Sequence, residues 1–352
     1  MSAPLALELY HLIIQYVHDQ ADLRALALCC LAFRDEAQRY LFRDIVPDSY
    51  DQRTKLISTI NGAPLRFGRL VHKLQIRDGL VSNPDDPLVS KPLSLALHAM
   101  YNLKHLELYL WRPSTVLQRC TFSLRILVWH AMNGPEVSFL LRNFLPTQNH
   151  IKSLEIIHWE EFDAMEVPTN LCPDLDSLGV NDSRLVSILL PEARLISHFQ
   201  WHGIYTPGTL TIRQLNHLES FKFYIAHSDS NTSFTQHMTS LIYLELEINV
   251  GSPPNLLPKI LFLRNLPQLQ VLILQTNYSY PNKWGDTYNP KFSVAFQRAF
   301  ELCPSLKYID VQEDRTGLKF DRIARPTVGI DGDLIWKKLV SVHADEVREW
   351  RL

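Results

Sequence analysis

Residue types that often do chemistry are present in this chain, but their spacing matches no familiar catalytic or metal site. His158 stands close to Glu160 and Glu161, yet a zinc-peptidase helix needs two histidines four residues apart. Cys29 and Cys30 are adjacent, whereas zinc motifs separate paired cysteines by two residues. Neither common spacing of a glycine-rich phosphate loop occurs. These patterns predict a protein that is not an enzyme and needs no metal or cofactor.

A cysteine nucleophile is the remaining catalytic option. The chain has 5 cysteines and 14 histidines, but no local sequence context marks one cysteine as a nucleophile. The two Trp-His pairs, at Trp129-His130 and Trp201-His202, are expected in strands rather than among metal ligands. An enzyme is therefore the third of three hypotheses, and the elements that carry these residues point to the other two.

Composition limits the class of protein. Of 352 residues 46% are hydrophobic, so a large core can form, and 35 basic against 37 acidic side chains leave a net charge of −2. That balance gives no general attraction to nucleic acid or to acidic membranes. Few, scattered cysteines fit a reducing compartment, and neither a membrane-spanning stretch nor a signal peptide is visible. We expect an intracellular protein, cytoplasmic or nuclear, without nucleic-acid or membrane partners.

A short apolar pattern recurs along the body of the chain. It consists of an aliphatic residue, two variable residues, an apolar residue, one variable residue and a second apolar residue, as in Leu103-Leu106-Leu108. The first positions are Val71, Leu103, Leu124, Ile151, Leu175, Ile196, Leu218, Leu241, Leu269 and Leu306. Their mean spacing of about 26 residues is typical of leucine-rich repeats, in which a short strand and a return segment form each unit.

These repeats predict an α/β fold, an irregular leucine-rich-repeat solenoid of about ten units over residues 71–315. Residues 47–70 are expected to be a linker or first helical unit. Residues 316–352 are expected to cap the far end, with a helix around Ile335, Trp336, Leu339 and Val342. The alternative is an ordinary α/β domain with strands at similar spacing.

Residues 1–46 show helical instead of strand periodicity. One apolar stripe consists of Leu9, Leu12, Ile13, Tyr16 and Val17. A second helix, which Asp22 can cap, and a third over Asp35–Phe42 are expected to follow. On a helix Cys29 and Cys30 would point about 100° apart, so at most one would face the core. Three helices in so short a domain are marginal alone and would be steadier packed against the repeats or a partner.

The order of residues over Ala3–Val46 resembles an F-box. The residues that carry the resemblance are Leu5-Ala6-Leu7-Glu8-Leu9, then Asp22-Leu23, then Cys29-Cys30-Leu31-Ala32-Phe33-Arg34, then Leu41-Phe42-Arg43. The chain departs from the family pattern at Ala6, where proline is usual, and at Leu31, where a basic residue is frequent. With the repeats behind it, this domain makes the chain similar to fungal-type F-box proteins with leucine-rich repeats.

The resemblance implies a substrate-recognition subunit of a cullin-based, SCF-type ubiquitin ligase. The F-box would bind a Skp-type adaptor, and through it a cullin, while the repeats would hold a target protein for ubiquitination. Carried over by position, the adaptor-binding residues would be Leu5, Glu8, Leu9, Leu12, Ile13, Leu23, Leu26 and Phe33. For each apolar position the alternative is a place in the core of the three helices.

A target surface follows from the alternation along the strands. Residues between the apolar columns face the other side of the sheet, which is concave in this architecture. Tyrosine and histidine suit partner contact because they join an apolar body to a polar tip. The candidate target-binding residues are Tyr109, His130, Glu155, His202, Tyr224, Glu245 and Glu247. The middle column adds Glu107 and Asp310 against Lys222 alone, and this acidic excess predicts a target segment with some basic character.

Two non-enzymatic hypotheses therefore stand beside each other. The first is the ubiquitin-ligase receptor, and the second is a leucine-rich interaction scaffold unconnected to ubiquitination, whose N-terminal helices only cap the repeats.

Overall fold

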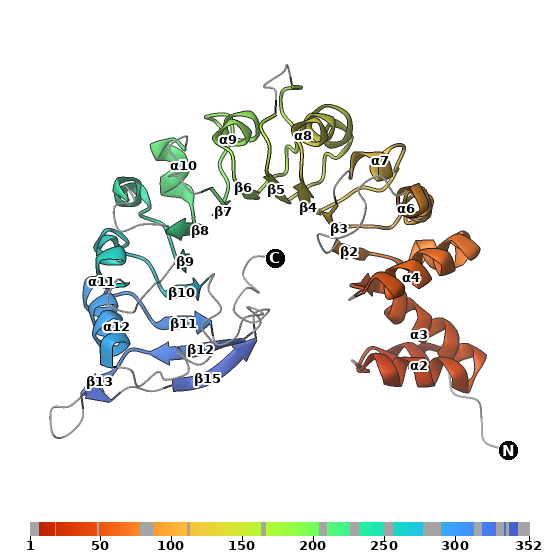
Figure 1. Ribbon diagram of the computed structural model, residues 1–352. Coiled ribbons are helices and arrows are strands. Elements are labelled where there is room, and N and C mark those ends of the chain that lie inside the picture. Colours follow the sequence, from red (N-terminus) through yellow and green to blue (C-terminus); the bar gives the residue numbers. More distant parts are fainter. Residues whose placement is uncertain are drawn as a thin grey trace. The chain divides into compact units, whose positions relative to one another are not determined.

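The computed structural model has a mixed α/β fold (Figure 1). It describes residues 7–17, 19–47, 49–77, 87–110, 113–162, 167–203, 210–225, 232–248, 256–276, 290–312, 319–328, 334–335 and 338–343. The chain forms two compact units, Met1–Leu175 and Asp176–Leu352. Within the described ranges, no helix combines the length and the apolarity needed to cross a membrane.

The first unit begins with three helices, α1 (Leu7–Ile14), α2 (Gln20–Cys29) and α3 (Leu31–Arg43). The carboxylate of Asp19, not that of Asp22, caps α2 by accepting hydrogen bonds from the N–H groups of Ala21 and Asp22. A cap must precede the unpaired N–H groups of the first turn, and only Asp19 is placed to do so. Cys30 has extended backbone angles between α2 and α3. Cys29 and Cys30 therefore do not share a helix, and both are exposed.

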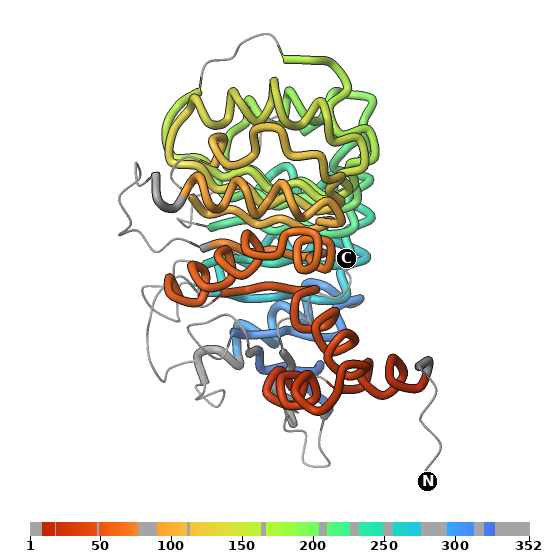
Figure 2. The backbone as a smooth tube through the Cα atoms, turned by 90° about the vertical axis from the view of Figure 1, so that its right-hand side faces the viewer, coloured from red at the N-terminus to blue at the C-terminus, as the bar shows by residue number. Residues whose placement is uncertain are grey.

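Five parallel strands follow in the first unit, each paired with the next in chain order. They are β1 (Asp44–Ile45), β2 (Lys73–Arg77), β3 (His105–Tyr109), β4 (Ile126–Ala131) and β5 (Ser153–His158). The return segments contain α4 (Tyr50–Gly62), α5 (Pro64–Phe67), η1 (Gly68–Leu70), α6 (Pro87–Ala99), α7 (Ser114–Leu117), α8 (Gly134–Phe139), η2 (Leu140–Phe144) and η3 (Leu145–Thr147). Figure 2 shows the first three helices, in red, beside the orange segments that begin this series.

The second unit continues the same plan before its last strands reverse direction. The strands β6 (Ser177–Val180), β7 (His198–Trp201), β8 (Ser220–Ile225), β9 (Tyr243–Ile248), β10 (Val271–Thr276) and β11 (Tyr308–Gln312) pair in parallel. Their return segments contain α9 (Ser183–Leu189), α10 (Ile212–His217), η4 (Ser233–His237), α11 (Leu256–Lys259), η6 (Leu261–Asn265) and α12 (Pro290–Leu302). β12 (Lys319–Ala324) and β15 (Lys338–His343) extend the sheet antiparallel. β13 (Thr327–Val328) and β14 (Leu334–Ile335) form a separate pair.

The repeated apolar pattern marks the strands correctly, since a strand lies at each of the ten predicted places. Within each unit the helices between strands lie on one face of the sheet (Figure 1). The patterned side chains are buried on that face, as Leu106, Trp129 and Phe221 illustrate. We call the opposite face the second face. The apolar pattern thus supplies the core, and the intervening residues supply the second face.

The helix expected in the tail is wrong. Ile335 lies in β14 and Leu339 and Val342 lie in β15, while Trp336 falls outside the described residues. Lys338–His343 contains two β-branched valines, and the edge of β12 offers it backbone hydrogen-bonding partners. Pairing with that edge satisfies the backbone of the segment, so the strand prevails over the helical spacing.

Candidate functional site

The three N-terminal helices present apolar side chains both inward and outward. Ile14, Leu23 and Ala37 form their buried core. On α1 the side chains of Leu9, Leu12 and Ile13 are 44%, 48% and 44% exposed, although Ile14 beside them is fully buried. Successive helical residues point about 100° apart, so a helix as apolar as α1 cannot place all of its side chains in one core.

The predicted adaptor-binding residues divide between this exposed surface and the core. Leu9, Leu12 and Ile13 lie on the surface. Leu23 is only 5% exposed and is part of the core itself, against which Leu26 and Phe33 pack half-buried. Leu5 lies outside the described residues, as does the side chain of Glu8. Leu23 lies in the core because α2 is amphipathic and its inner apolar side packs against Ile14 and Ala37.

Three further exposed apolar residues in the N-terminal segment were not among the predicted adaptor-binding residues: Tyr16, Leu28 and Leu31. Leu28 lies off the inner apolar side of α2, which is a signal present in the sequence. Leu31 is the first residue of α3. The extended backbone of Cys30 ends α2, so Leu31 points in a different direction from the one that a continuous helix would give it. No glycine or proline marks this break in the sequence.

The N-terminal helices are continuous with the sheet that follows them. The N–H group of His72 donates to the carbonyl of Arg43 at 2.8 Å, and β1 pairs with β2. The rings of Phe42 and Phe67 stack with their centroids 4.6 Å apart. The first helices are therefore packed against the start of the repeats rather than joined to them by a free linker.

The second face of the first unit carries two histidine–glutamate pairs. Glu107 Oε1 lies 2.8 Å from His105 Nε2, two residues earlier on the same strand and hence on the same face. Glu155 Oε1 lies 3.1 Å from Nε2 of His130 on the neighbouring strand. The His130 ring packs against the ring of Tyr109 at a centroid distance of 4.0 Å. Tyr109, His130 and Glu155 are thus one connected group, as their common face predicts.

The second face of the second unit contains two ion pairs across adjacent strands. Lys222 lies opposite Glu245 in the register of β8 and β9, and their side chains approach to 2.9 Å. Asp310 lies opposite Arg322 in the register of β11 and β12, where two N–H groups of the guanidinium donate to the two carboxylate oxygens at 2.8 Å each. Glu245 is 1% exposed and Asp310 is fully buried. Directly opposite residues on one face are close enough for such pairing.

These contacts bear on the prediction that the target segment has some basic character. The four carboxylates of the middle column, those of Glu107, Glu155, Glu245 and Asp310, each have a histidine, lysine or arginine beside them. Lys222 and Arg322 offset the charges of Glu245 and Asp310, whereas His105 and His130 would offset those of Glu107 and Glu155 only when protonated. The acidic excess of the middle column is therefore confined to Glu107 and Glu155 in the first unit, and the basic target segment remains a prediction. Glu245 is too deeply buried to reach a partner, whereas Tyr224, Glu247 and His202 of the same unit are partly exposed.

The described residues were also compared with the geometry that a metal site needs. Within the described ranges, no group of three or more histidine, cysteine, aspartate or glutamate side chains is placed to hold a metal ion. The five cysteines are free thiols, and burial raises the pKa of Cys120 to about 12. Cys120 is therefore a protonated thiol near neutral pH and a poor nucleophile.

Comparison with known proteins adds no relative: no family model matches the chain, and no curated protein matches its sequence.

Proposed function

We propose that this protein is an F-box receptor with leucine-rich repeats, the substrate-recognition subunit of a cullin-based ubiquitin ligase. Residues 1–46 would bind a Skp-type adaptor and the repeat region would bind a target protein. The order of F-box-like residues and the ten regularly spaced strands support the proposal together. Neither requires a catalytic residue in this chain.

The observation that carries the proposal is the exposed apolar row on α1. Leu9, Leu12 and Ile13 leave roughly half of each side chain in water, while the helix core is already filled by Ile14. Contiguous exposed apolar surface of this kind marks a protein-binding site more often than a solvated face. The three residues are also among those that the F-box resemblance assigns to the adaptor.

The second face of each sheet is the proposed surface for the target. In the first unit, the rings of Tyr109 and His130 pack against each other beside Glu155, so this group joins aromatic and polar contacts. In the second unit, the partly exposed Tyr224 and Glu247 offer similar chemistry. This favours a target recognised through aromatic and hydrogen-bonding contacts.

Pull-down of a Skp-type adaptor with the full chain tests the proposal. We expect the native chain to retain the adaptor, and Leu9→Glu and Leu12→Glu to weaken retention about tenfold or more, because each places a charge in an apolar contact. The matched control is Leu65→Glu, a change at an exposed leucine outside α1–α3 that should leave binding unchanged. Lack of adaptor binding by the native chain, or full binding by both α1 variants, would contradict the proposal.

An interaction scaffold without ubiquitin-ligase function is the second candidate. It is favoured by the continuity of α3 with the sheet through the Phe42–Phe67 stack and the β1–β2 pairing, since terminal units commonly cap repeat arrays. The same pull-down separates the two. A cap predicts that Leu9→Glu and Leu12→Glu change no partner, whereas an F-box predicts loss of the adaptor while the target is still bound.

A further inference from the structure

A row of basic side chains runs along one edge of the sheet in the first unit. Each member is the residue directly before one of the strands β1 to β5, and parallel strands begin at the same edge of a sheet. Consecutive members are neighbours, because the N–H group of each donates to the carbonyl of the member before it at 2.7–2.8 Å. We call this set the basic row, and its members are Arg43, His72, Lys104, Arg125 and Lys152.

The sheet fixes the spacing of the basic row. Neighbouring strands lie about 4.8 Å apart, so the four steps from Arg43 to Lys152 cover about 19 Å. From His72 onward the residue before each member is fully buried; these residues are Val71, Leu103, Leu124 and Ile151. The backbone is therefore held by the core and by the hydrogen bonds between members. Four of the five side chains are exposed, and that of Lys104 is half-buried.

The fold of the repeats does not require these charges. The second unit has the same series of backbone hydrogen bonds before its strands, and there the members are Asp176, Ser197, Glu219, Ile242, Gln270 and Lys307. Like charges on directly adjacent strands repel, so the basic row makes the folded first unit less stable than a mixed row would. An anion bound along the row relieves that repulsion, which makes this edge a candidate binding surface.

The charge of the basic row is not offset by its surroundings. Within the described residues, no acidic side chain forms an ion pair with the lysines and arginines of the row. Lys104 Nζ donates to the carbonyl of Ser123 at 3.2 Å, a contact that leaves its charge in place. In the next position along the strands, the acidic Asp44 is balanced by Lys73 opposite it. Four positive charges thus lie on one edge of a chain whose net charge is −2.

The dimensions and composition of the basic row favour an acidic peptide segment over a nucleic acid. An extended chain advances about 3.3 Å per residue, so about six residues match the length of the row. Proteins that bind single-stranded nucleic acid commonly add aromatic side chains on which the bases stack, and the row contains no Phe, Tyr or Trp. The net negative charge of the chain also opposes a long polyanion more than a short one.

We propose that the basic row binds an acidic segment of a partner protein, extended across the starts of the strands, with its carboxylates on Arg43, Lys104, Arg125 and Lys152. This edge includes neither α1 nor the second face of the sheet. The proposal is therefore separate from the adaptor and target surfaces, and it holds whether or not the protein is an F-box receptor.

Fluorescence anisotropy with the full chain and labelled hexaglutamate tests the proposal. In about 0.1 M salt, charges more than about 10 Å apart are largely screened, so the measurement reports the charges near the peptide. We expect hexaglutamate to bind about tenfold or more tightly than hexaglutamine, because only carboxylates form charge-assisted hydrogen bonds with the row. Equal binding of the two peptides, or no binding of hexaglutamate at millimolar concentration, would overturn the proposal. Tighter binding of hexathymidylate than of hexaglutamate would overturn it in favour of a nucleic acid.

A double charge reversal locates the site. Arg125 and Lys152 are both exposed, so Arg125→Glu with Lys152→Glu should leave the thermal unfolding of the protein cooperative. The double variant replaces two attractive charges by repulsive ones, and we expect it to weaken hexaglutamate binding about tenfold or more. An unchanged affinity would overturn the proposal.

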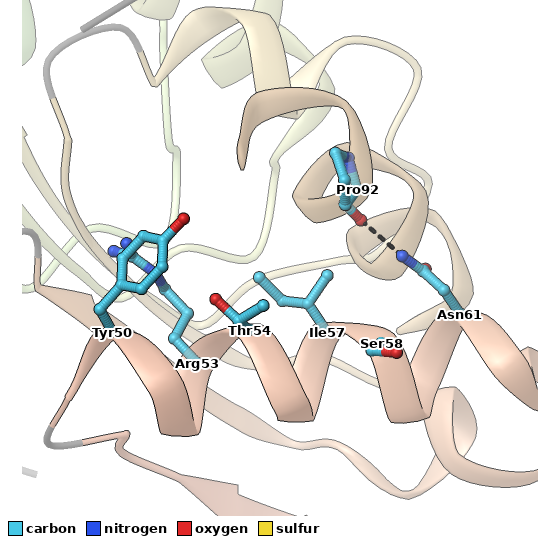
Figure 3. Close-up of a pocket in the computed structure, with 7 residues that line it drawn as sticks. All are labelled: Tyr50, Arg53, Thr54, Ile57, Ser58, Asn61 and Pro92. Carbon is cyan, nitrogen blue, oxygen red and sulfur yellow. Dashed lines mark hydrogen bonds between the residues drawn. The ribbon is translucent and has the colours of Figure 1, made fainter. Parts of the chain in front are cut away.

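The matched control changes two exposed cations that lie in helices. Lys55→Glu with Arg213→Glu alters the net charge by the same amount, in α4 and α10. Asn61 Nδ2 of α4 donates to the carbonyl of Pro92 at 2.9 Å and ties this helix to α6 (Figure 3), so the control charge at Lys55 lies on a fixed element. We expect the control to change the affinity by less than about twofold, because screening limits the effect of charges outside the row. Equal weakening by the two double variants would show that net charge determines binding, and would overturn the proposal.

Discussion

The pair of Asp310 and Arg322 shows how a single buried charge depends on one neighbour. Asp310 is fully buried and receives two hydrogen bonds from a guanidinium that also packs over the ring of Tyr308. Arg322→Met keeps an apolar stem over Tyr308 but leaves the carboxylate buried without this partner. We expect the free energy of unfolding to fall by about 3 kcal/mol, measured by chemical denaturation.

The control for this prediction is an exposed pair in the same unit. Arg298 and Glu301 form an ion pair 2.9 Å long in which each side chain is about half exposed, so Arg298→Met should leave the midpoint of unfolding unchanged. Adding Asp310→Val to Arg322→Met should recover part of the loss, because it removes the buried charge beside the apolar Ile273. A double variant no more stable than Arg322→Met would mean that the loss comes from packing instead.

Alternation along the strands was enough to predict which side chains share the second face, but not which of them pair. Lys222 and Glu245 were both placed in the middle column, and the strand register confirms that they are neighbours there. Arg322 was not expected beside Asp310, since it lies on an antiparallel strand beyond the last apolar repeat. The burial of Glu245 depends on the surrounding side chains, which no local pattern encodes.

At the scale of an element, the close contact of η1 with the end of α6 requires a glycine, which has no side chain, at position 68. Gly68 is buried, and a Cβ atom added there would lie 2.7 Å from the Cβ of Ala99 and would overlap the Ala99 carbonyl oxygen. Backbone atoms cannot move aside as a side-chain tip can, so Gly68→Ala should destabilise the protein by about 1–3 kcal/mol in chemical denaturation.

The matched change is Gly62→Ala at the end of α4. A Cβ atom added at Gly62 meets nothing within 4 Å. Alanine restricts the unfolded chain more than glycine does, so stability should stay the same or rise by up to about 1 kcal/mol. A Gly68→Ala variant as stable as Gly62→Ala would show that η1 and α6 separate without cost, contrary to the close packing between them.

The type of an element could be predicted where its apolar residues fit only one spacing, that of a strand or that of a helix. It could not be predicted where they fit both. Leu106 and Leu108 alternate within a short segment and give a strand on any reading of the sequence. In the tail, Leu339 and Val342 are three residues apart, which fits one face of a helix, while Val340 and Val342 alternate as in a strand. The free edge of β12 decides between them, and that edge is a property of the assembled sheet rather than of the segment.

At the scale of the whole molecule, the last strands determine how the sheet of the second unit ends. β12 and β15 pair antiparallel beyond β11, and Arg322 of β12 provides the partner of the buried Asp310. Removal of residues 316–352 would leave β11 with an unpaired edge and an uncompensated carboxylate. Unpaired edges add strands from other chains, so we expect the truncated protein to elute from size-exclusion chromatography as large aggregates.

A shorter truncation is the control for this last prediction. Ending the chain after His343 keeps β12 and β15 intact, so this variant should elute at the same position as the full chain. The charge at Asp310 is a separate contribution from the exposed edge. Adding Asp310→Val to the 316–352 deletion should therefore leave the aggregation in place, because the edge of β11 stays open. A soluble 316–352 deletion with a cooperative unfolding transition would show that β11 needs neither the strands that cover its edge nor the Arg322 partner of Asp310.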